Sequence, residues 1–358
     1  MKPRTSHTSA VVLLGLLALA GCGPSQERTN SIVVAVGGGE WADANMKAYV
    51  APFERETGIR VVPVRDDLEL SRLKLMEETG QVDVDVGNLG AVQAMQAARL
   101  GYLTPIDYTV FDPTELQGLS GEPRKQWGVG SLYYAIVIGF DTSGVGPRPK
   151  SWADIWNVKL FPGPRTFMNG RVGTGPIEEA LIADGVPPDK LYPLDLDRAF
   201  AKLDQIKPQV IKWWNAGSEG EQLFRDRQVR VGELYDARLA ALKAAGKPVD
   251  FTYDQGKRLI DYWIIPKGAP NAEAAQKFIA FVTRAKQQAA FVSLMPYGPT
   301  NQRAFALVPE RLARQLPSHP ENLKRQFAQD HEWYAALQPD GRSNLDHVID
   351  RWNRWVTQ

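Results

Sequence analysis

The sequence predicts an α/β protein of two lobes, each a sheet flanked by helices, with a ligand site between them. Three observations support this prediction. The chain has 358 residues, more than one hydrophobic core usually serves. Short β-branched runs alternate with segments of helical periodicity along most of its length. Pro147 and Pro149 separate two such series and mark a boundary between lobes.

The opening elements follow the order strand, loop, helix, strand. We expect a strand at residues 31–36, a glycine loop at 37–39, a helix at 44–57 and a strand at 60–64. Pro52 lies inside the helical segment and predicts a kink. This order is typical of a βαβ unit, whose two strands are parallel.

The later segments continue the alternation. Ser151 and Asp154 form a capping box at the start of a short helix. The tail, residues 309–355, is expected to be mostly helical. The remaining patterns predict helices at 68–79, 91–100, 176–183, 196–206, 237–245 and 271–294, and strands at 82–86, 133–140, 229–235 and 259–265.

Composition excludes several classes of protein. Lys and Arg total 42 and Asp and Glu total 41, so the chain lacks the basic excess of a nucleic-acid binder. The single cysteine, Cys22, rules out a disulfide within the chain, and with four scattered histidines it argues against a zinc site. We expect neither a metal nor a cofactor.

The first 21 residues are typical of an export signal. Lys2 and Arg4 precede an apolar run at 10–20 that is too short to span a bilayer, and Leu19-Ala20-Gly21-Cys22 follows it. This ending resembles the lipobox of bacterial lipoproteins, which implies a lipid on Cys22 as the mature N-terminus. The alternative is an ordinary signal peptide with an accidental cysteine.

Four motifs resemble the periplasmic solute-binding proteins of ABC importers, most closely the polyamine-binding branch. They are 49–59 (YVAPFERETGI), 151–156 (SWADIW), 274–279 (AAQKFI) and 297–301 (YGPTN), and the resemblance spans roughly residues 32–305 in the expected order.

This resemblance implies a type II-like periplasmic binding protein and no enzymatic activity. We expect a monomer that binds a small amine-bearing solute, does not bind nucleic acid, is held at the membrane in the periplasm by its lipid, and delivers the solute to an ABC permease of the inner membrane. The expected division is signal peptide 1–21, tether 22–30, lobe 1 at 31–138 plus 264–305, and lobe 2 at 139–263 plus 306–358.

Asp261 is the candidate ligand for an amine. It matches the Asp that the polyamine branch carries on the strand ending in Ile-Pro, and a carboxylate among apolar neighbours needs a cation. The alternative is a partner within the protein, Lys257 or Arg258. The sequence departs from the branch at Leu259, where the branch carries an aromatic. It also has no acid near Gly173-Thr174-Gly175-Pro176 before Glu178 and Glu179.

Arg238 is the candidate ligand for a carboxylate. The segment Leu234-Tyr235-Asp236-Ala237-Arg238 resembles a turn of the family where some amine-binding relatives carry such an Arg, and Tyr235 is a further candidate. The alternative is a solvated Arg238 paired with Asp236. Asp261 and Arg238 together would bind a zwitterion.

The first lobe contributes weaker candidates. Glu40 and Trp41 follow the glycine loop, Asn88 follows the strand expected at 82–86, and Tyr297 matches an aromatic of the family. Each also has an explanation in packing or capping. Trp41 is the best of them, because a Trp can stack on a cation.

Several functions remain open on sequence alone. A γ-amino acid fits Asp261 with Arg238, whereas a polyamine fits the wider family. Ferric-ion binding would need adjacent tyrosines in the cleft, and Tyr133-Tyr134 is the only such pair. No Gly-x-Ser-x-Gly elbow, His-Glu-x-x-His motif or Cys-His pair supports a secreted enzyme.

Overall fold

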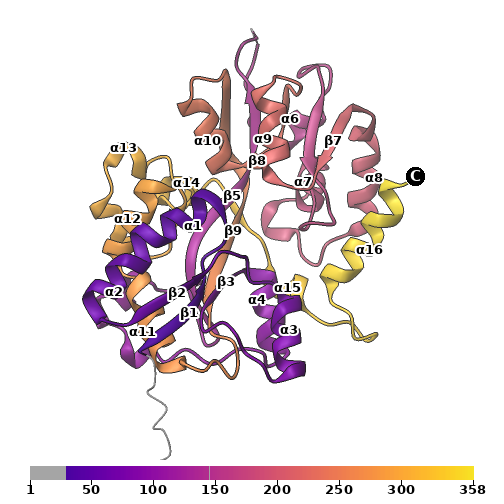
Figure 1. Cartoon of the computed structure of the whole chain (residues 1–358). Coiled ribbons are helices and arrows are strands. Elements are labelled where there is room, and N and C mark those ends of the chain that lie inside the picture. Colours follow the sequence, from indigo (N-terminus) through magenta and orange to yellow (C-terminus); the bar gives the residue numbers. More distant parts are fainter. Residues whose placement is uncertain (1–29, 145) are drawn as a thin grey trace, which may run out of the picture. The chain divides into compact units, whose positions relative to one another are not determined.

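Two long strands organise the fold. In the computed structural model, which describes residues 30–144 and 146–358, β5 (Gly128–Asp141) and β9 (Val249–Ile264) pair antiparallel over most of their lengths. Both pass between the two ends of the unit formed by residues 31–358 (Figure 1). The sequence predicted only the apolar part of each strand, because the remainder is more polar or richer in glycine.

The other strands pair around these two. Six strands follow the order β11-β9-β5-β8-β6-β7, while β3 pairs with β9 and both β4 and β10 pair with β5. Their bounds are β3 Gly87–Gly90, β4 Arg124–Lys125, β6 Arg165–Met168, β7 Val210–Trp214, β8 Val231–Tyr235, β10 Gly298–Pro299 and β11 Phe327–Ala328.

The predicted βαβ unit is confirmed. β1 (Ser31–Ala35) and β2 (Arg60–Val64) form a parallel pair. The helix between them begins earlier than expected and has three parts: α1 (Gly39–Asn45), a π-helical turn η1 (Met46–Val50) and α2 (Ala51–Thr57). Pro52 follows the π-helical turn directly, at the start of α2, so the predicted irregularity at this position is a change of helix type.

Three predicted elements were wrong in detail. Residues 82–86 do not form a strand. The strand β3 (Gly87–Gly90) begins directly after them. The helix expected at 271–294 is two helices, α11 (Ala272–Val282) and α12 (Ala285–Leu294), because the chain turns at Thr283 and Arg284. The tail contains the helices α13 (Glu310–Ala313), α14 (Pro320–Leu323), α15 (His331–Ala335) and α16 (Asn344–Val356), separated by turns and β11.

The remaining helices agree in position with their sequence patterns or fill the connections. The Ser151–Asp154 capping box is present at the start of α6. Their bounds are α3 Leu70–Thr79, α4 Ala91–Arg99, α5 Pro113–Gly118, α6 Trp152–Trp156, α7 Ile177–Ala183, α8 Leu196–Ile206, α9 Gly217–Arg225 and α10 Asp236–Ala244.

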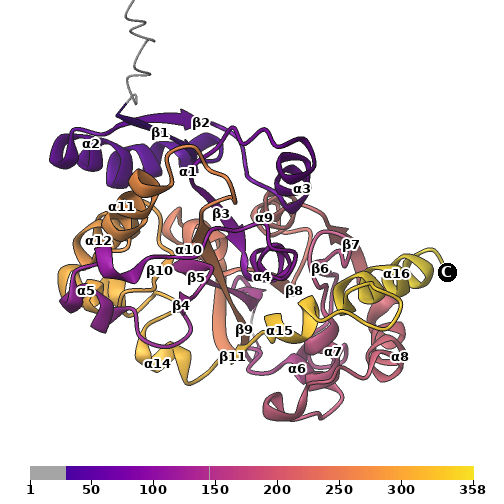
Figure 2. The ribbon, with the colours of Figure 1, turned by 90° about the horizontal axis from the view of Figure 1, so that it is seen from below.

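Separate hydrophobic cores lie at the two ends of the long strands. One packs Phe53, Trp263 and Phe278 among α1, α2, α11 and β1, and Figure 2 shows α11 and α12 beside α1 and α2. Another packs Trp152 and Trp352 among α6, α7, α8 and α16, which Figure 1 shows at the opposite end. Side chains carried by β5 and β9 between these cores are therefore placed to face a ligand.

The export signal at 1–21, Cys22 and most of the tether at 22–30 lie outside the described residues. Among the helices that the structure does describe, none combines the length and the apolar character that a membrane span requires.

Candidate functional site

A cavity of about 760 Å³ brings together six of the seven predicted ligand-binding residues. Its walls come from the start of α1 and the residue before it, from the segment after β2, from β5, from α9, from the end of β8 with the start of α10, from β9 and from the end of α12 with the segment after it. The predicted residues that line it are Glu40, Trp41, Tyr235, Arg238, Asp261 and Tyr297.

Asp261 presents an unpaired carboxyl to this cavity. Its side chain is half-buried, and its Oδ1 is enclosed without a hydrogen-bond partner. Burial raises the pKa of Asp261 from 3.8 to about 7, against the lowering effect of a hydrogen bond from Tyr134, and the charge of Asp67 raises it further. A cation at this position would stabilise the ionised carboxylate.

The alternative that Asp261 pairs within the protein is wrong for both residues considered. Lys257 is fully buried, and its Nζ lies 3.2 Å from Oε2 of Glu178. Arg258 donates from Nη2 to Oε2 of Glu122 at 3.0 Å. Both cations flank Asp261 in sequence, but each is used by another acid.

Arg238 lies in the first turns of α10, half exposed. Its Nη1 lies 2.7 Å from Oε2 of Glu221 on α9. The predicted pairing with Asp236 is wrong, because that buried carboxylate accepts from the amide of Ala135 and the hydroxyl of Tyr253. A carboxylate in the cavity could therefore bind the guanidinium atoms that Glu221 does not use.

Aromatic side chains surround these charges. The Trp41 ring meets that of Tyr297 edge to face, with centroids 5.5 Å apart, and the rings of Tyr134 and Tyr235 lie 5.8 Å apart. Gly37 lets Trp41 take its place, because its φ is +70° and an added Cβ would lie 2.6 Å from the indole. The glycine loop therefore positions an aromatic wall.

Three further residues with polar side chains line the cavity and were not predicted as ligand-binding residues, namely Asp67, Tyr134 and Glu221. The sequence offered Tyr133 and Tyr134 only as an adjacent pair for ferric ion, yet strand alternation separates them. Tyr133 donates to Glu122, while Tyr134 lies beside Asp261. This alternation was the available signal for Tyr134. It also removes the adjacent-tyrosine pair on which ferric-ion binding depended.

Asn88 is not among the residues that line the cavity. It lies on β3 opposite Trp263, and its buried Nδ2 has no hydrogen-bond partner. Its contact with a ligand stays a prediction.

The chemistry of the cavity is that of a binding site. Four carboxylates and one guanidinium line it, with one of those carboxylates paired to the guanidinium. Within residues 30–144 and 146–358, no three His, Cys, Asp or Glu side chains gather in a way that would hold a metal ion. The arrangement can bind an ammonium at Asp261 and a carboxylate at Arg238.

Comparison with known proteins identifies the family. Residues 48–315 match the family of bacterial extracellular solute-binding proteins. The γ-aminobutyric acid-binding protein of Pseudomonas aeruginosa is 33% identical over 352 residues, which is 96% of each chain. The putrescine-binding periplasmic protein SpuD of the same species is 24% identical over 338 residues, which is 85% of this chain and 88% of that one.

Comparison with solved structures indicates the same family. The structure of a γ-aminobutyrate receptor superposes with a TM-score of 0.81 at 36% identity, covering 91% of this chain and 97% of that one. The predicted two-lobed α/β fold of a periplasmic binding protein is thereby confirmed. These matches cover most of the chain. They show that it belongs to the bacterial extracellular solute-binding proteins of ABC-type uptake systems, a family that serves in transport.

Proposed function

We propose that this protein is a lipid-anchored periplasmic receptor for a small zwitterion of the γ-aminobutyrate class, which it delivers to an ABC permease of the inner membrane. One observation supports this most strongly. The Asp261 carboxyl faces the cavity without an ion-pair partner among the described residues, and the same cavity contains the guanidinium of Arg238.

The ammonium end of the ligand would bind at Asp261. A buried carboxylate without a counterion is unfavourable, so the protein gains most from a ligand that supplies one. Trp41 and Tyr297 form a T-shaped pair in the same cavity. Their faces and edges suit the short methylene chain next to the ammonium.

The carboxylate end would bind at Arg238. Glu221 bonds to Nη1, and the guanidinium has further donors. Both Arg238 and Asp261 lie close enough to Tyr297 to act on its pKa, which burial chiefly raises to about 12. The two charges therefore flank one aromatic, as a ligand with opposite charges at its ends requires. The names of the γ-aminobutyrate-binding relatives agree with this proposal.

A linear diamine is the second candidate. Glu40 and Asp67 also line the cavity, and they give it more acid than Arg238 can neutralise. A second ammonium could bind near these carboxylates, as the putrescine-binding relative suggests.

Isothermal titration of the mature chain distinguishes the two candidates. The ligands are γ-aminobutyrate, putrescine, n-butylamine and butyrate, which share four carbons and differ in their end groups. The proposal expects γ-aminobutyrate to bind at least tenfold more tightly than n-butylamine, with putrescine weaker still. Tighter binding of putrescine would replace the zwitterion by the diamine, and no binding of any amine would end both proposals.

The lipid anchor has its own test. Cys22 is expected to carry the lipid, so metabolic labelling with a fatty acid should mark the parent chain and not the Cys22→Ser variant. Equal labelling of both chains, or none of either, would contradict the anchor.

A further inference from the structure

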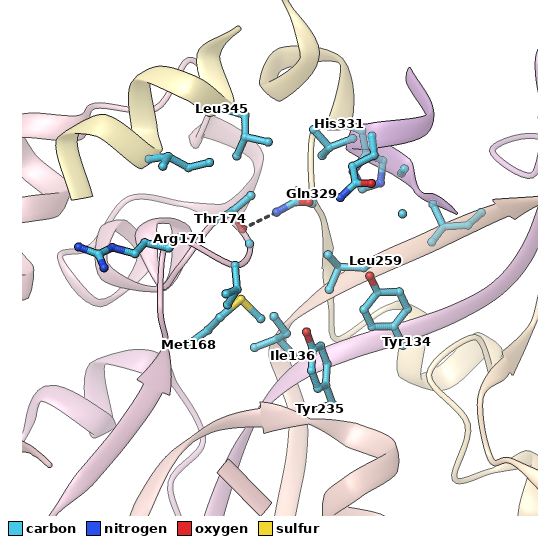
Figure 3. A pocket seen from close by; sticks show the side chains of 18 residues that line it. Tyr134, Ile136, Met168, Arg171, Thr174, Tyr235, Leu259, Gln329, His331 and Leu345 are labelled. Carbon is cyan, nitrogen blue, oxygen red and sulfur yellow. Dashed lines mark hydrogen bonds between the residues drawn. The ribbon is translucent and has the colours of Figure 1, made fainter. Parts of the chain in front are cut away.

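A second pocket of about 240 Å³ shares Tyr134 and Tyr235 with the candidate site. Figure 3 shows both tyrosines at its floor, with Leu259 and Ile136 beside them. Most of its lining is apolar, and its polar side chains other than the tyrosines are those of Gln93, Arg171, Thr174, Gln329 and His331. This combination of an apolar wall and a few convergent polar groups is typical of a ligand site.

The second pocket adjoins the Asp261 end of the candidate site. Gly90 lines the pocket, and a Cβ built on Gly90 would lie 3.6 Å from Oδ1 of Asp261. Leu259 also lines it. Leu259 lies on the same face of β9 as Asp261, because the two are two positions apart in the strand. Arg238 does not line it. A group attached to the ligand nitrogen would therefore enter this pocket.

No carboxylate lines the second pocket. On the side of Thr174, the acids Glu178 and Glu179 are fully buried, and both are bonded to Lys257. Nζ of Lys257 also bonds to Oγ1 of Thr174 at 3.3 Å, which fixes this wall. An ammonium in the pocket would thus find both of these acids already bonded to Lys257, so its desolvation would be uncompensated.

His331 supplies an unused hydrogen-bonding group. The residue is 8% exposed, and both ring nitrogens lack hydrogen-bond partners. Glu122 lies 3.9 Å from Nε2, too far for a hydrogen bond. Burial lowers the pKa of His331 to about 4, so the ring is neutral near pH 7, with one donor and one acceptor. A ligand hydroxyl or amide would satisfy it.

We propose that this pocket is a second subsite, which takes an uncharged, hydroxyl- or amide-bearing substituent on the nitrogen of the ligand and rejects an ammonium-bearing one. The proposal rests on the proposed function, because it assumes that the ligand nitrogen binds at Asp261. The natural ligand class would then include N-substituted γ-amino acids as well as γ-aminobutyrate.

A matched ligand series tests the subsite. The mature chain is titrated with γ-aminobutyrate and with its N-propyl, N-(3-hydroxypropyl) and N-(3-aminopropyl) derivatives. We expect the hydroxypropyl derivative to bind within threefold of γ-aminobutyrate or more tightly, and at least tenfold more tightly than the aminopropyl derivative.

Two variants locate the effect. Leu259→Phe fills the second pocket, so it should weaken the hydroxypropyl derivative at least tenfold and leave γ-aminobutyrate within threefold. His331→Phe should remove the advantage of the hydroxypropyl over the propyl derivative, without changing the affinity for γ-aminobutyrate.

The outcomes separate the two proposals. Equal affinities for the hydroxypropyl and aminopropyl derivatives, or a Leu259→Phe variant that binds all four ligands like the parent, would overturn the subsite. Binding of γ-aminobutyrate without any of its derivatives would also overturn the subsite and leave the proposed function intact. Failure of γ-aminobutyrate itself to bind would overturn the proposed function, and the subsite with it.

Discussion

Two carboxylate sites lie near the second pocket, and they differ in where their counterion comes from. Glu178 and Glu179 are fully buried in α7 and share the ammonium of Lys257, which bonds to their carboxylates at 3.1–3.2 Å. Asp261 has an enclosed oxygen but forms no ion pair with any of the residues that the structure describes. The protein has completed one charge site internally and left the other to be completed by a ligand.

The difference shows how a structural acid can be distinguished from a binding acid. Hydrogen bonds from Tyr192, Tyr334 and Gln329 further satisfy Glu178, so that site is closed on all sides. Asp261 faces a cavity. Unpaired charge that faces open volume is costly unless a ligand arrives, which makes it the stronger indication of function.

The largest expected effect follows from removing Lys257, the cation that the chain itself supplies to Glu178 and Glu179. Lys257→Met should destabilise the protein by about 3–5 kcal/mol at pH 8, because it leaves buried carboxylates without a partner. The loss should be smaller at pH 5. Burial raises the pKa of Glu179 to about 7 and that of Glu233 well above its usual value, so these groups are protonated there. Urea unfolding at the two pH values measures both.

Lys243→Met is the matched control, because Lys243 pairs with Asp250 at the surface. This substitution should lower the free energy of unfolding by less than about 1 kcal/mol. Equal losses for the two variants would mean that the buried cluster is not held by its charge.

Asp261→Asn should have the opposite effect on the free protein and a large effect on binding. The raised pKa of Asp261, about 7, means that its proton stabilises the unliganded fold at low pH, and this contribution is lost as the pH rises through 7. The variant should therefore be more stable than the parent at pH 8 and equal to it at pH 4. Its affinity for γ-aminobutyrate should fall by about 2–4 kcal/mol.

Thermal unfolding and titration calorimetry measure the two effects. Asp254→Asn, which removes an acid paired with Arg325 outside the cavity, should leave binding unchanged. A destabilised Asp261→Asn protein at pH 8 would show that Asp261 has an internal partner after all.

The affinity for γ-aminobutyrate should also depend on pH. Below pH 7 the ligand ammonium must displace a proton from Asp261. As the pH rises from 5.5 to 7, Kd should therefore fall about tenfold for each pH unit, and above pH 7 it should level off. Calorimetry in two buffers should detect the release of about one proton at pH 6 and almost none at pH 8.5. A Kd that stays constant from pH 5.5 to 7 would mean that Asp261 is already ionised in the free protein.

The sequence alone was enough to select Asp261 as a candidate binding residue, but not to identify the residues that surround it. A lone Asp in an apolar strand predicts a need for a cation, but only the tertiary structure shows that Lys257 and Arg258 are occupied by distant acids. Tyr134 and Glu221 were missed because their roles depend on which strand and helix face the cavity. Likewise, the break between α11 and α12 involves distant residues, since Asn301 donates to the carbonyl of Thr283 and Glu115 accepts from the amide of Ala285.

The smallest expected effect concerns Arg238, since it is half exposed and partly engaged by Glu221. Arg238→Gln should weaken γ-aminobutyrate by about three- to tenfold and leave n-butylamine unchanged, because only the first ligand carries a carboxylate. Arg225→Gln is the matched control, since Arg225 pairs with the same Glu221 but does not line the cavity. If Arg238→Gln weakened both ligands equally, Arg238 would shape the cavity through Glu221 rather than bind the carboxylate. The ligand would then be defined by its amine alone, bound at Asp261.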